Sequence, residues 1–150
     1  IIQFINSLSQ LENLFLYNIV TDIDDINLNI INKLYRLGIS HDEGVDVNKI
    51  ITKLAQKTTS NVLEIDYYLY SALENYYRNQ IDREEVKQEI LIELEENYRN
   101  SLNKDIYDDE EIERMVREYM EGLSNYYIES LVDERINNMV SKNMERFWFY

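Results

Sequence analysis

Carboxylates are the side chains of this chain with the clearest spacing for chemistry. Glu85, Glu89 and Glu93 recur at every fourth residue, and Glu129 and Asp133 repeat that interval near the C-terminus. Mg²⁺ prefers carboxylate oxygens, and nucleotide hydrolases built only from helices hold the ion between acids on facing helices. One hypothesis is therefore an all-α Mg-dependent nucleotide hydrolase, which requires carboxylates that converge in one pocket.

The surroundings of these acids instead indicate a solvated helix surface. The row of Glu85, Glu89 and Glu93 runs beside an apolar stripe, where the exposed flank of an amphipathic helix is expected. Other acids have a basic residue four positions later, a spacing typical of ion pairs on a helix surface: Glu95 with Arg99, Glu110 with Arg114, and Glu113 with Arg117. We therefore predict no metal site, no cofactor and no catalytic residue in this chain.

The other residues that could act as metal ligands or nucleophiles are sparse. His41 is the only histidine and cysteine is absent, so a zinc site lacks ligands and no thiol can attack a substrate. The chain also has no glycine-rich phosphate loop and no serine in a nucleophile elbow. These absences favour a binding protein over an enzyme.

One row of basic residues suggests a different role. Lys49, Lys53 and Lys57 recur at four-residue intervals and are expected on one side of a short helix. Lysine ammonium groups contact phosphates, so another hypothesis is a helical accessory domain of a replication or other nucleic-acid-processing protein that contacts nucleotide or DNA phosphates. The net charge of −14 disfavours direct nucleic-acid binding, because such surfaces are usually basic.

Helix start signals define the elements that would position these side chains. Asp82 and Asp108 are each followed three residues later by a glutamate, which is the pattern of a capping box. Similar signals ahead of periodic apolar runs predict further helices over residues 9–20, 46–57 and 60–79, and one that begins at Ser124. Apolar residues between Ile26 and Leu37 predict another helix, with Gly38 just after its end.

The composition predicts an all-α fold. The chain of 150 residues has no proline and only three glycines, so it lacks the turn residues that sandwiches and barrels need. We predict a single compact bundle of six to seven helices over residues 1–150. The expected core includes one central helix with four apolar or aromatic members: Tyr67, Tyr70, Leu73 and Tyr77. Because the sequence begins with Ile and ends on four aromatic residues, we expect a fragment of a longer chain.

Acidity is concentrated in one helical pair, which suggests the function. Between Asp82 and Glu121 there are fifteen acids and six bases. We predict that these helices bind a protein partner with a basic surface, with nucleic-acid mimicry as one mode. The predicted contact residues are Glu85, Glu89, Glu93, Glu96, Glu110, Glu111 and Glu118. The composition resembles that of small acidic helical proteins of viruses and other mobile elements, which is a likeness to a broad group rather than to one family.

The sequence also predicts where the protein acts. It has no apolar run near eighteen residues and no signal peptide. We therefore expect a protein that is not secreted and has no membrane partner, located in the cytoplasm or, in a eukaryotic host, in the nucleus.

Overall fold

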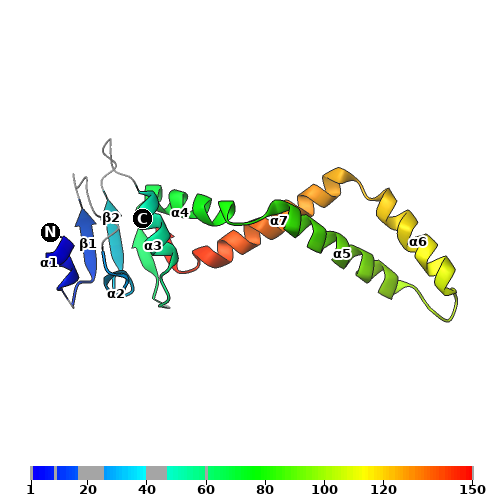
Figure 1. Ribbon diagram of the computed structural model, residues 1–150, viewed down its shortest axis with the longest axis horizontal. Coiled ribbons are helices and arrows are strands. Elements are labelled where there is room, and N and C mark those ends of the chain that lie inside the picture. The colour runs from blue at the N-terminus through cyan, green and yellow to red at the C-terminus, as the bar shows by residue number, and fades with distance from the viewer. Residues whose placement is uncertain (1, 9, 17–25, 40–46, 60, 150) are drawn as a thin grey trace. The chain divides into compact units, whose positions relative to one another are not determined.

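The chain forms two compact units. The computed structural model describes residues 2–8, 10–16, 26–39, 47–59 and 61–149. Unit 1 comprises Ile1–Gln80 and Val140–Tyr150, and unit 2 comprises Ile81–Met139. Figure 1 labels the helices and strands of both units.

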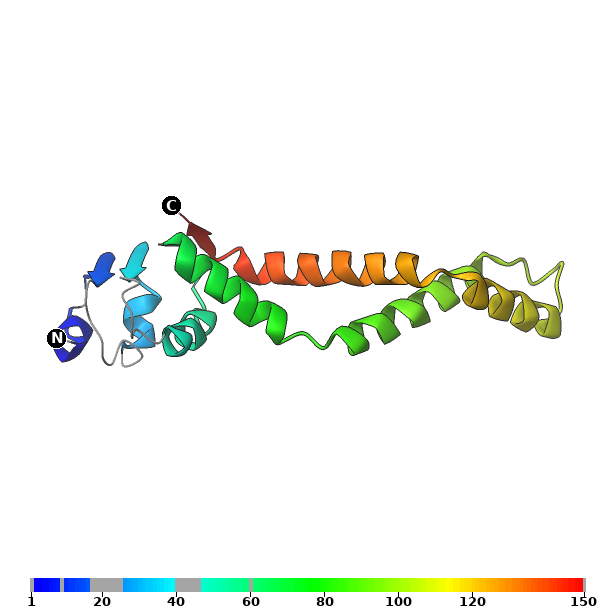
Figure 2. The same cartoon turned by 90° about the horizontal axis from the view of Figure 1, so that it is seen from above.

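Unit 1 contains a parallel four-stranded sheet. Its strands β1 (Asn13–Leu16), β2 (Arg36–Ile39), β3 (Leu63–Ile65) and β4 (Phe147–Phe149) are neighbours in chain order. The helices of this unit among the described residues are α1 (Ile2–Asn6), α2 (Leu28–Ile31), α3 (Asn48–Ala55), α4 (Tyr67–Asn79) and the end of α7 (Asn125–Met144), residues 140–144. The strands lie on one side of α2 and α3 (Figure 2).

The core of unit 1 lies between the sheet and its helices. Alternate strand residues point toward the helices and are buried, as expected for a strand with one covered face. Apolar residues of the helices and their flanks complete this core. The buried residues from the strands are Leu14, Leu37, Ile39, Leu63, Ile65 and Phe147, and those from the helices and flanks include Ile30, Ile31, Leu34, Ile50, Leu54, Leu69 and Leu73.

Unit 2 interrupts a regular series of strands in unit 1. Asn13 pairs with Arg36 and Arg36 with Glu64, so neighbouring positions on the first three strands are 23 and 28 residues apart. Leu63 pairs with Phe147, 84 residues later, and the 59 residues of unit 2 fall inside that interval, which leaves 25. Unit 2 is therefore inserted in the sequence between the third and fourth strands of the sheet.

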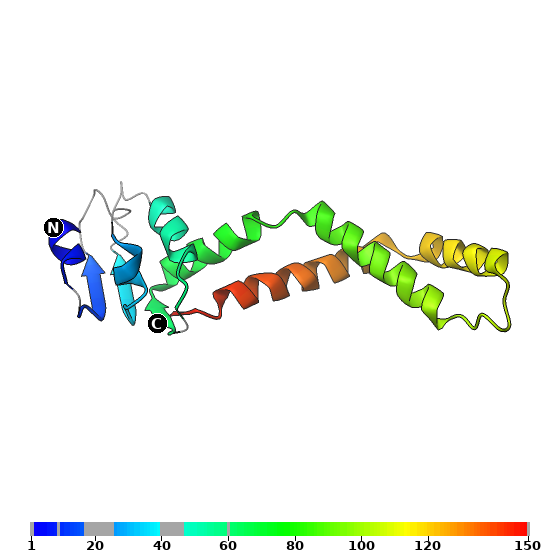
Figure 3. The ribbon, with the colours of Figure 1, turned by 60° about the horizontal axis from the view of Figure 1, so that its bottom comes forward.

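Unit 2 consists of helices only. It contains α5 (Arg83–Ser101), α6 (Asp109–Gly122) and the part of α7 (Asn125–Met144) that ends at Met139. Figure 3 shows α5 and α6 as a helical hairpin, and Tyr98 stacks on Tyr119 between them with ring centroids 4.1 Å apart. One buried stripe on each helix forms the apolar contact: Val86, Ile90, Ile112, Val116, Ile128, Val132 and Ile136.

The predicted starts of these three helices are confirmed. The Asp82 carboxylate accepts hydrogen bonds from the backbone N–H groups of Glu84 and Glu85, at 3.0 and 3.3 Å. Asp108 accepts one from the N–H of Glu111 at 2.8 Å, and the Ser124 hydroxyl accepts one from that of Tyr127 at 3.1 Å. The side chains thus satisfy N–H groups that have no partner within the first helical turn.

The prediction of an all-α bundle is wrong, although the chain is mostly helical. Strand β1 lies where the helix from Ser9 was expected, and β2 includes Leu37 and Gly38, which were assigned to a helix and its end. Strand β3 replaces the first turns of the helix expected from Ser60, so that α4 instead begins after Asp66. Ser9, Asp46 and Ser60 lie outside the described residues. The number of domains stays a prediction.

The predicted core of the central helix is confirmed in part. Leu73 and Tyr77 are buried in α4, whereas Tyr70 is half-buried and Tyr67 is exposed. The rings of Tyr67 and Tyr70 lie against Phe149 of β4, with centroids 5.6 and 4.9 Å apart. These two tyrosines therefore pack on the last strand rather than in the centre of the unit.

Candidate functional site

The two units differ most in charge. Unit 2 has 18 acidic and seven basic residues in 59 positions, so its net charge is −11 of the total of −14. The remaining 91 residues have 11 acids and eight bases, a net charge of −3. The acidity of the chain is therefore a property of the inserted unit.

Four of the seven bases in unit 2 form ion pairs that link its helices. Arg83 of α5 bonds to Asp133 of α7 at 2.6 Å and also to Glu129, which Lys87 approaches to 3.3 Å. Arg135 of α7 makes two hydrogen bonds to Glu93 of α5, at 2.6 and 2.8 Å. Arg99 joins α5 to α6 through Glu113 at 3.2 Å.

These contacts shift the ionisation of the paired groups. Hydrogen bonds from Arg135 hold the pKa of Glu93 below its ordinary value, and Arg83 and then Lys87 do the same for the pKa of Glu129. Glu93 is therefore occupied by an internal contact. Of the seven predicted partner-binding acids, it is the one whose carboxylate already has a bidentate partner.

The other six predicted contact acids face solvent. Their side chains are exposed and make no hydrogen bond or ion pair with any residue that the structure describes: Glu85, Glu89, Glu96, Glu110, Glu111 and Glu118. Glu89 lies within electrostatic reach of Arg135. The helix period places Glu85, Glu89 and Glu96 on one side of α5, and Glu110 and Glu111 lie in the first turn of α6.

The carboxylates do not converge in the described part of the chain. Within the ranges that the structure describes, no group of three or more His, Cys, Asp or Glu side chains could hold a metal ion. The hydrolase hypothesis therefore has no cluster to support it among those residues. His41 lies outside them.

The predicted lysine row does not form on one surface. Helix α3 ends at Ala55, so Lys57 lies beyond the helix that was expected to align it with Lys49 and Lys53. Lys57 is 0% exposed, and its ammonium donates hydrogen bonds to the carbonyl of Thr59 at 2.8 Å and to the carbonyl of Asn61. Burial, and then the nearby Arg146, lower the pKa of Lys57. The row is thus reduced to an exposed Lys49 and a half-buried Lys53.

The structure reveals a surface that the sequence analysis missed. We call it the open sheet face, and it comprises the strand positions that point away from the helices. Asn13, Arg36, Glu64 and Trp148 lie in register across all four strands, and Arg36 Nε contacts Glu64 Oε2 at 2.6 Å. Together with Tyr35 and Val62 they line a cavity of about 240 Å³.

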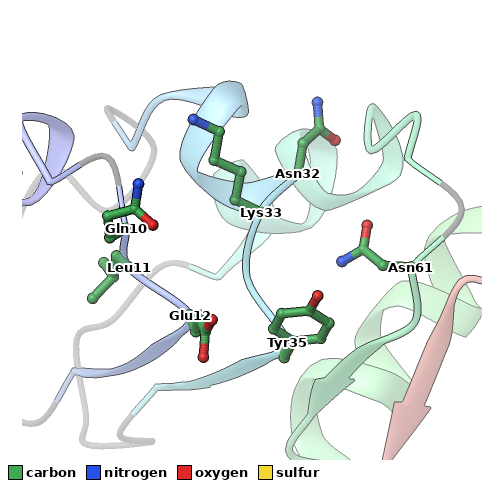
Figure 4. Close-up of a pocket in the computed structure, with 7 residues that line it drawn as sticks. All are labelled: Gln10, Leu11, Glu12, Asn32, Lys33, Tyr35 and Asn61. Atoms are coloured by element: carbon green, nitrogen blue, oxygen red, sulfur yellow. The ribbon is translucent and has the colours of Figure 1, made fainter.

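A second cavity adjoins the first at the amino-terminal ends of the strands. It has a volume of about 440 Å³ and shares Tyr35 as a wall (Figure 4). The residues around Tyr35 come from the segments that precede β1, β2 and β3, and they are mostly polar: Gln10, Leu11, Glu12, Asn32, Lys33 and Asn61.

Comparison with known proteins adds no functional assignment. No family model, no curated protein and no solved structure matches the chain significantly. Across the described ranges, no helix combines the length and the apolar character needed to cross a membrane. A function for this chain is therefore argued from its own side chains.

Proposed function

We propose that this chain is a non-enzymatic binding protein whose unit 2 engages a basic surface of a protein partner. The observation that supports it is the distribution of charge in unit 2, where the net charge is −11. Four of its seven basic residues form ion pairs between the helices, whereas six of the predicted contact acids form no hydrogen bond or ion pair with the described residues. One of the six, Glu89, lies within electrostatic reach of Arg135.

This arrangement separates the acids that hold the unit together from those available to a partner. Glu93, Glu113 and Glu129 take part in ion pairs between helices. The unpaired carboxylates repel one another, which costs folding stability, and a basic partner would relieve that repulsion. Complementary charge chiefly raises the association rate, and the increase shrinks as salt screens the field.

Nucleic-acid mimicry is the finer form of this proposal. Glu85 and Glu89 are one turn apart on α5, so their two negative charges are about 6 Å apart along the helix axis. A phosphate backbone also presents regularly spaced negative charges. A partner that uses basic side chains to bind phosphates would meet a similar pattern on unit 2.

The test uses acids whose replacement leaves the internal ion pairs intact. Glu96 and Glu118 lie in the middle of α5 and α6, away from the helix ends, and both are exposed. A partner captured from the source cell would be purified, and its association rate with wild type and with Glu96→Lys/Glu118→Lys measured as salt is raised. We expect the double variant to associate about tenfold more slowly at low salt, with the difference lost at high salt.

Glu145→Lys is the matched control for each single reversal. Glu145 is an exposed acid of unit 1, so this variant changes the net charge by the same amount outside the proposed surface. It should associate at nearly the wild-type rate. Equal slowing by Glu96→Lys and Glu145→Lys would show that only the total charge matters, and the proposal would fail.

A further inference from the structure

We propose that the open sheet face of unit 1 is a second binding site, which docks an extended, uncharged peptide segment of a partner protein through a bulky apolar side chain. The site is independent of the acidic surface of unit 2. It comprises the cavity of about 240 Å³ between Tyr35 and Trp148 and the adjoining cavity beyond Tyr35.

Among the described residues, no helix covers the open sheet face, which is unusual for a parallel sheet. Parallel sheets nearly always have both faces covered, because their crossover helices pack on them. Here the strands' other face is exposed, with Phe15 at 44%, Val62 at 45% and Trp148 at 62%. Neighbouring residues that point toward the helices, Leu37 and Leu63, are fully buried. The apolar surface left in water marks a binding face.

The size of the cavity limits its occupant. At about 240 Å³ it is smaller than the roughly 300–1,000 Å³ typical of small-molecule sites. Its walls are the aromatic rings of Tyr35 and Trp148 and the side chain of Val62, together with three polar side chains: Asn13, Arg36 and Glu64. This part of the site fits one large apolar side chain of a peptide.

The charge of the face indicates an uncharged ligand. Arg36 and Glu64, the two ionic groups in the registered row, neutralise each other at 2.6 Å. The face therefore has no excess charge, in contrast to unit 2. Trp, Tyr and Arg are the residues most enriched at binding hot spots, and Asn supplies adaptable hydrogen bonds.

The exposed area favours a peptide over a second copy of the chain. A fully buried aromatic side chain contributes about 150–250 Å². Trp148, Tyr35 and Phe15 are 62%, 54% and 44% exposed, so together they offer about 240–400 Å². A stable protein–protein interface buries about 800 Å² on each partner. The exposed aromatic surface alone is well below that area, and it is sufficient to anchor a short segment.

The second cavity gives such a segment a path. Tyr35 forms part of both cavities, so a peptide anchored beside Trp148 can continue over Tyr35 toward the amino-terminal ends of the strands. Figure 4 shows Tyr35 and the other residues that line the second cavity. Gln10, Glu12 and Lys33 line that continuation and present polar groups to the main chain of the peptide.

The probe is a phage-displayed library of random peptides panned against the full chain. Trp148 is the only tryptophan of the chain. Binding of a peptide that has no tryptophan would therefore be detected as a blue shift of Trp148 fluorescence. We expect enriched peptides that share a bulky apolar residue, bind Trp148→Ala about tenfold or more weakly, and lose little affinity as salt rises. Trp148→Phe, which retains an aromatic ring, should bind within a few-fold of wild type.

Two further variants separate this site from unit 2 and from self-association. Glu96→Lys/Glu118→Lys should bind the enriched peptides as wild type does, because both acids lie in unit 2. Peptides that are basic, lose affinity in salt and bind Trp148→Ala unchanged would overturn the inference. So would a failure to enrich any peptide, or a wild-type dimer in sedimentation that Trp148→Ala dissociates.

Discussion

Unit 1 and unit 2 differ in how they bury apolar side chains and in how they provide partners for charged ones. Unit 1 buries strand residues beneath its helices. It also buries Lys57, whose ammonium has no carboxylate partner among the described residues and bonds instead to carbonyl oxygens of Thr59 and Asn61. Unit 2 has a narrow apolar stripe and ties its helices with arginine–carboxylate pairs at its surface. The acidity of the chain is therefore local: it belongs to unit 2, whose fold uses few of its carboxylates in ion pairs.

The largest expected change in the free energy of unfolding comes from the core of unit 1. Leu73 of α4 is fully buried, so Leu73→Ala should lower the free energy of unfolding by about 2–5 kcal/mol. Hydrogen exchange would show the loss in the protection of β2 and β3. Ile92→Ala, at an exposed position of α5, is the control and should change stability by less than about 0.5 kcal/mol. A similar small change for both variants would contradict the packed core described for unit 1.

The next largest loss of stability is expected when Lys57 is replaced. Lys57→Met keeps an unbranched apolar stem but leaves the carbonyls of Thr59 and Asn61 without their donor. We expect a loss of about 1–3 kcal/mol in chemical denaturation, the cost of unpaired buried polar groups. Lys142→Met, at an exposed position of α7, should be nearly neutral. If Lys57→Met is equally neutral, the ammonium does not order these loops.

The same variant gives a pH dependence with a definite sign. The folded state lowers the pKa of Lys57, so unfolding is accompanied by proton uptake in the range between the lowered pKa and the ordinary value of about 10.4. The stability of wild type relative to Lys57→Met should therefore rise as pH increases toward about 10.4. A relative loss over that range would show that the hydrogen bonds to the ammonium outweigh its burial.

Unit 2 could be predicted from the sequence because its signals are local. Asp82, Asp108 and Ser124 bond to backbone groups two or three residues away, and the apolar stripes behind them follow the helix period. The exposed flank of α5 followed from the same period.

The ion pairs between helices were missed, because residues such as Glu93 and Arg135 are 42 positions apart. Glu95 does pair with Arg99, as its spacing predicted, but Glu113 pairs with Arg99 rather than with Arg117.

Unit 1 could not be predicted from the same signals because its pairing is between distant residues. The strands have three or four residues each, too few to show a clear alternation of apolar and polar residues. Leu11 and Leu14, and likewise Leu34 and Leu37, are three residues apart, which is a helix-like spacing. One short repeat in the sequence does mark the strands. An apolar–any–apolar triplet occurs in every strand, at residues 14–16, 37–39, 63–65 and 147–149.

Lys57 shows why the lysine row was wrongly predicted. Its place in the row assumed a helix through residue 57, but α3 stops at Ala55 and the loop that follows turns the lysine inward. The residues that receive its ammonium belong to the connection into β3. Without the sheet neither that loop nor the register of Trp148 with Glu64 was foreseeable.

A smaller effect is expected at the helix caps of unit 2. Asp82→Ala and Asp108→Ala each remove hydrogen bonds to the first helical turn, so each should cost about 1 kcal/mol. Asp109→Ala, next to the second cap but with no hydrogen bond to it, is the control. Hydrogen exchange should weaken in the first turns of α5 or α6 and stay unchanged in the strands. Equal losses in the strands would contradict the division into two units.

Acid should weaken unit 2 selectively. Ion pairs hold the pKa of Glu93 and Glu129 below the ordinary value of about 4.3, so their stabilising contribution is present above that pH and is lost as pH falls through the lowered values. Arg135→Gln removes the partner of Glu93. Its difference from wild type in denaturation midpoint should be clear near neutral pH and shrink below about pH 4. A difference that is constant with pH would show that Arg135 acts by packing.

The smallest expected effect is on the folding stability of the charge-reversal variant. Glu96 and Glu118 are exposed and make no ion pair with the described residues, so Glu96→Lys/Glu118→Lys removes no contact. Reversal instead reduces the repulsion within a unit of net charge −11. The free energy of unfolding should therefore change by less than about 0.5 kcal/mol per site, toward greater stability at low salt.

Glu93→Lys is the informative contrast for that measurement. It makes the same change of charge on α5, but it replaces a bidentate partner of Arg135 with a second cation and should destabilise unit 2 at every salt concentration. Urea denaturation of both variants at low and high salt would separate acids that stabilise the fold from acids that do not. If Glu96→Lys/Glu118→Lys destabilises unit 2 as Glu93→Lys does, the exposed carboxylates are structural. In that case they would not be free for a partner.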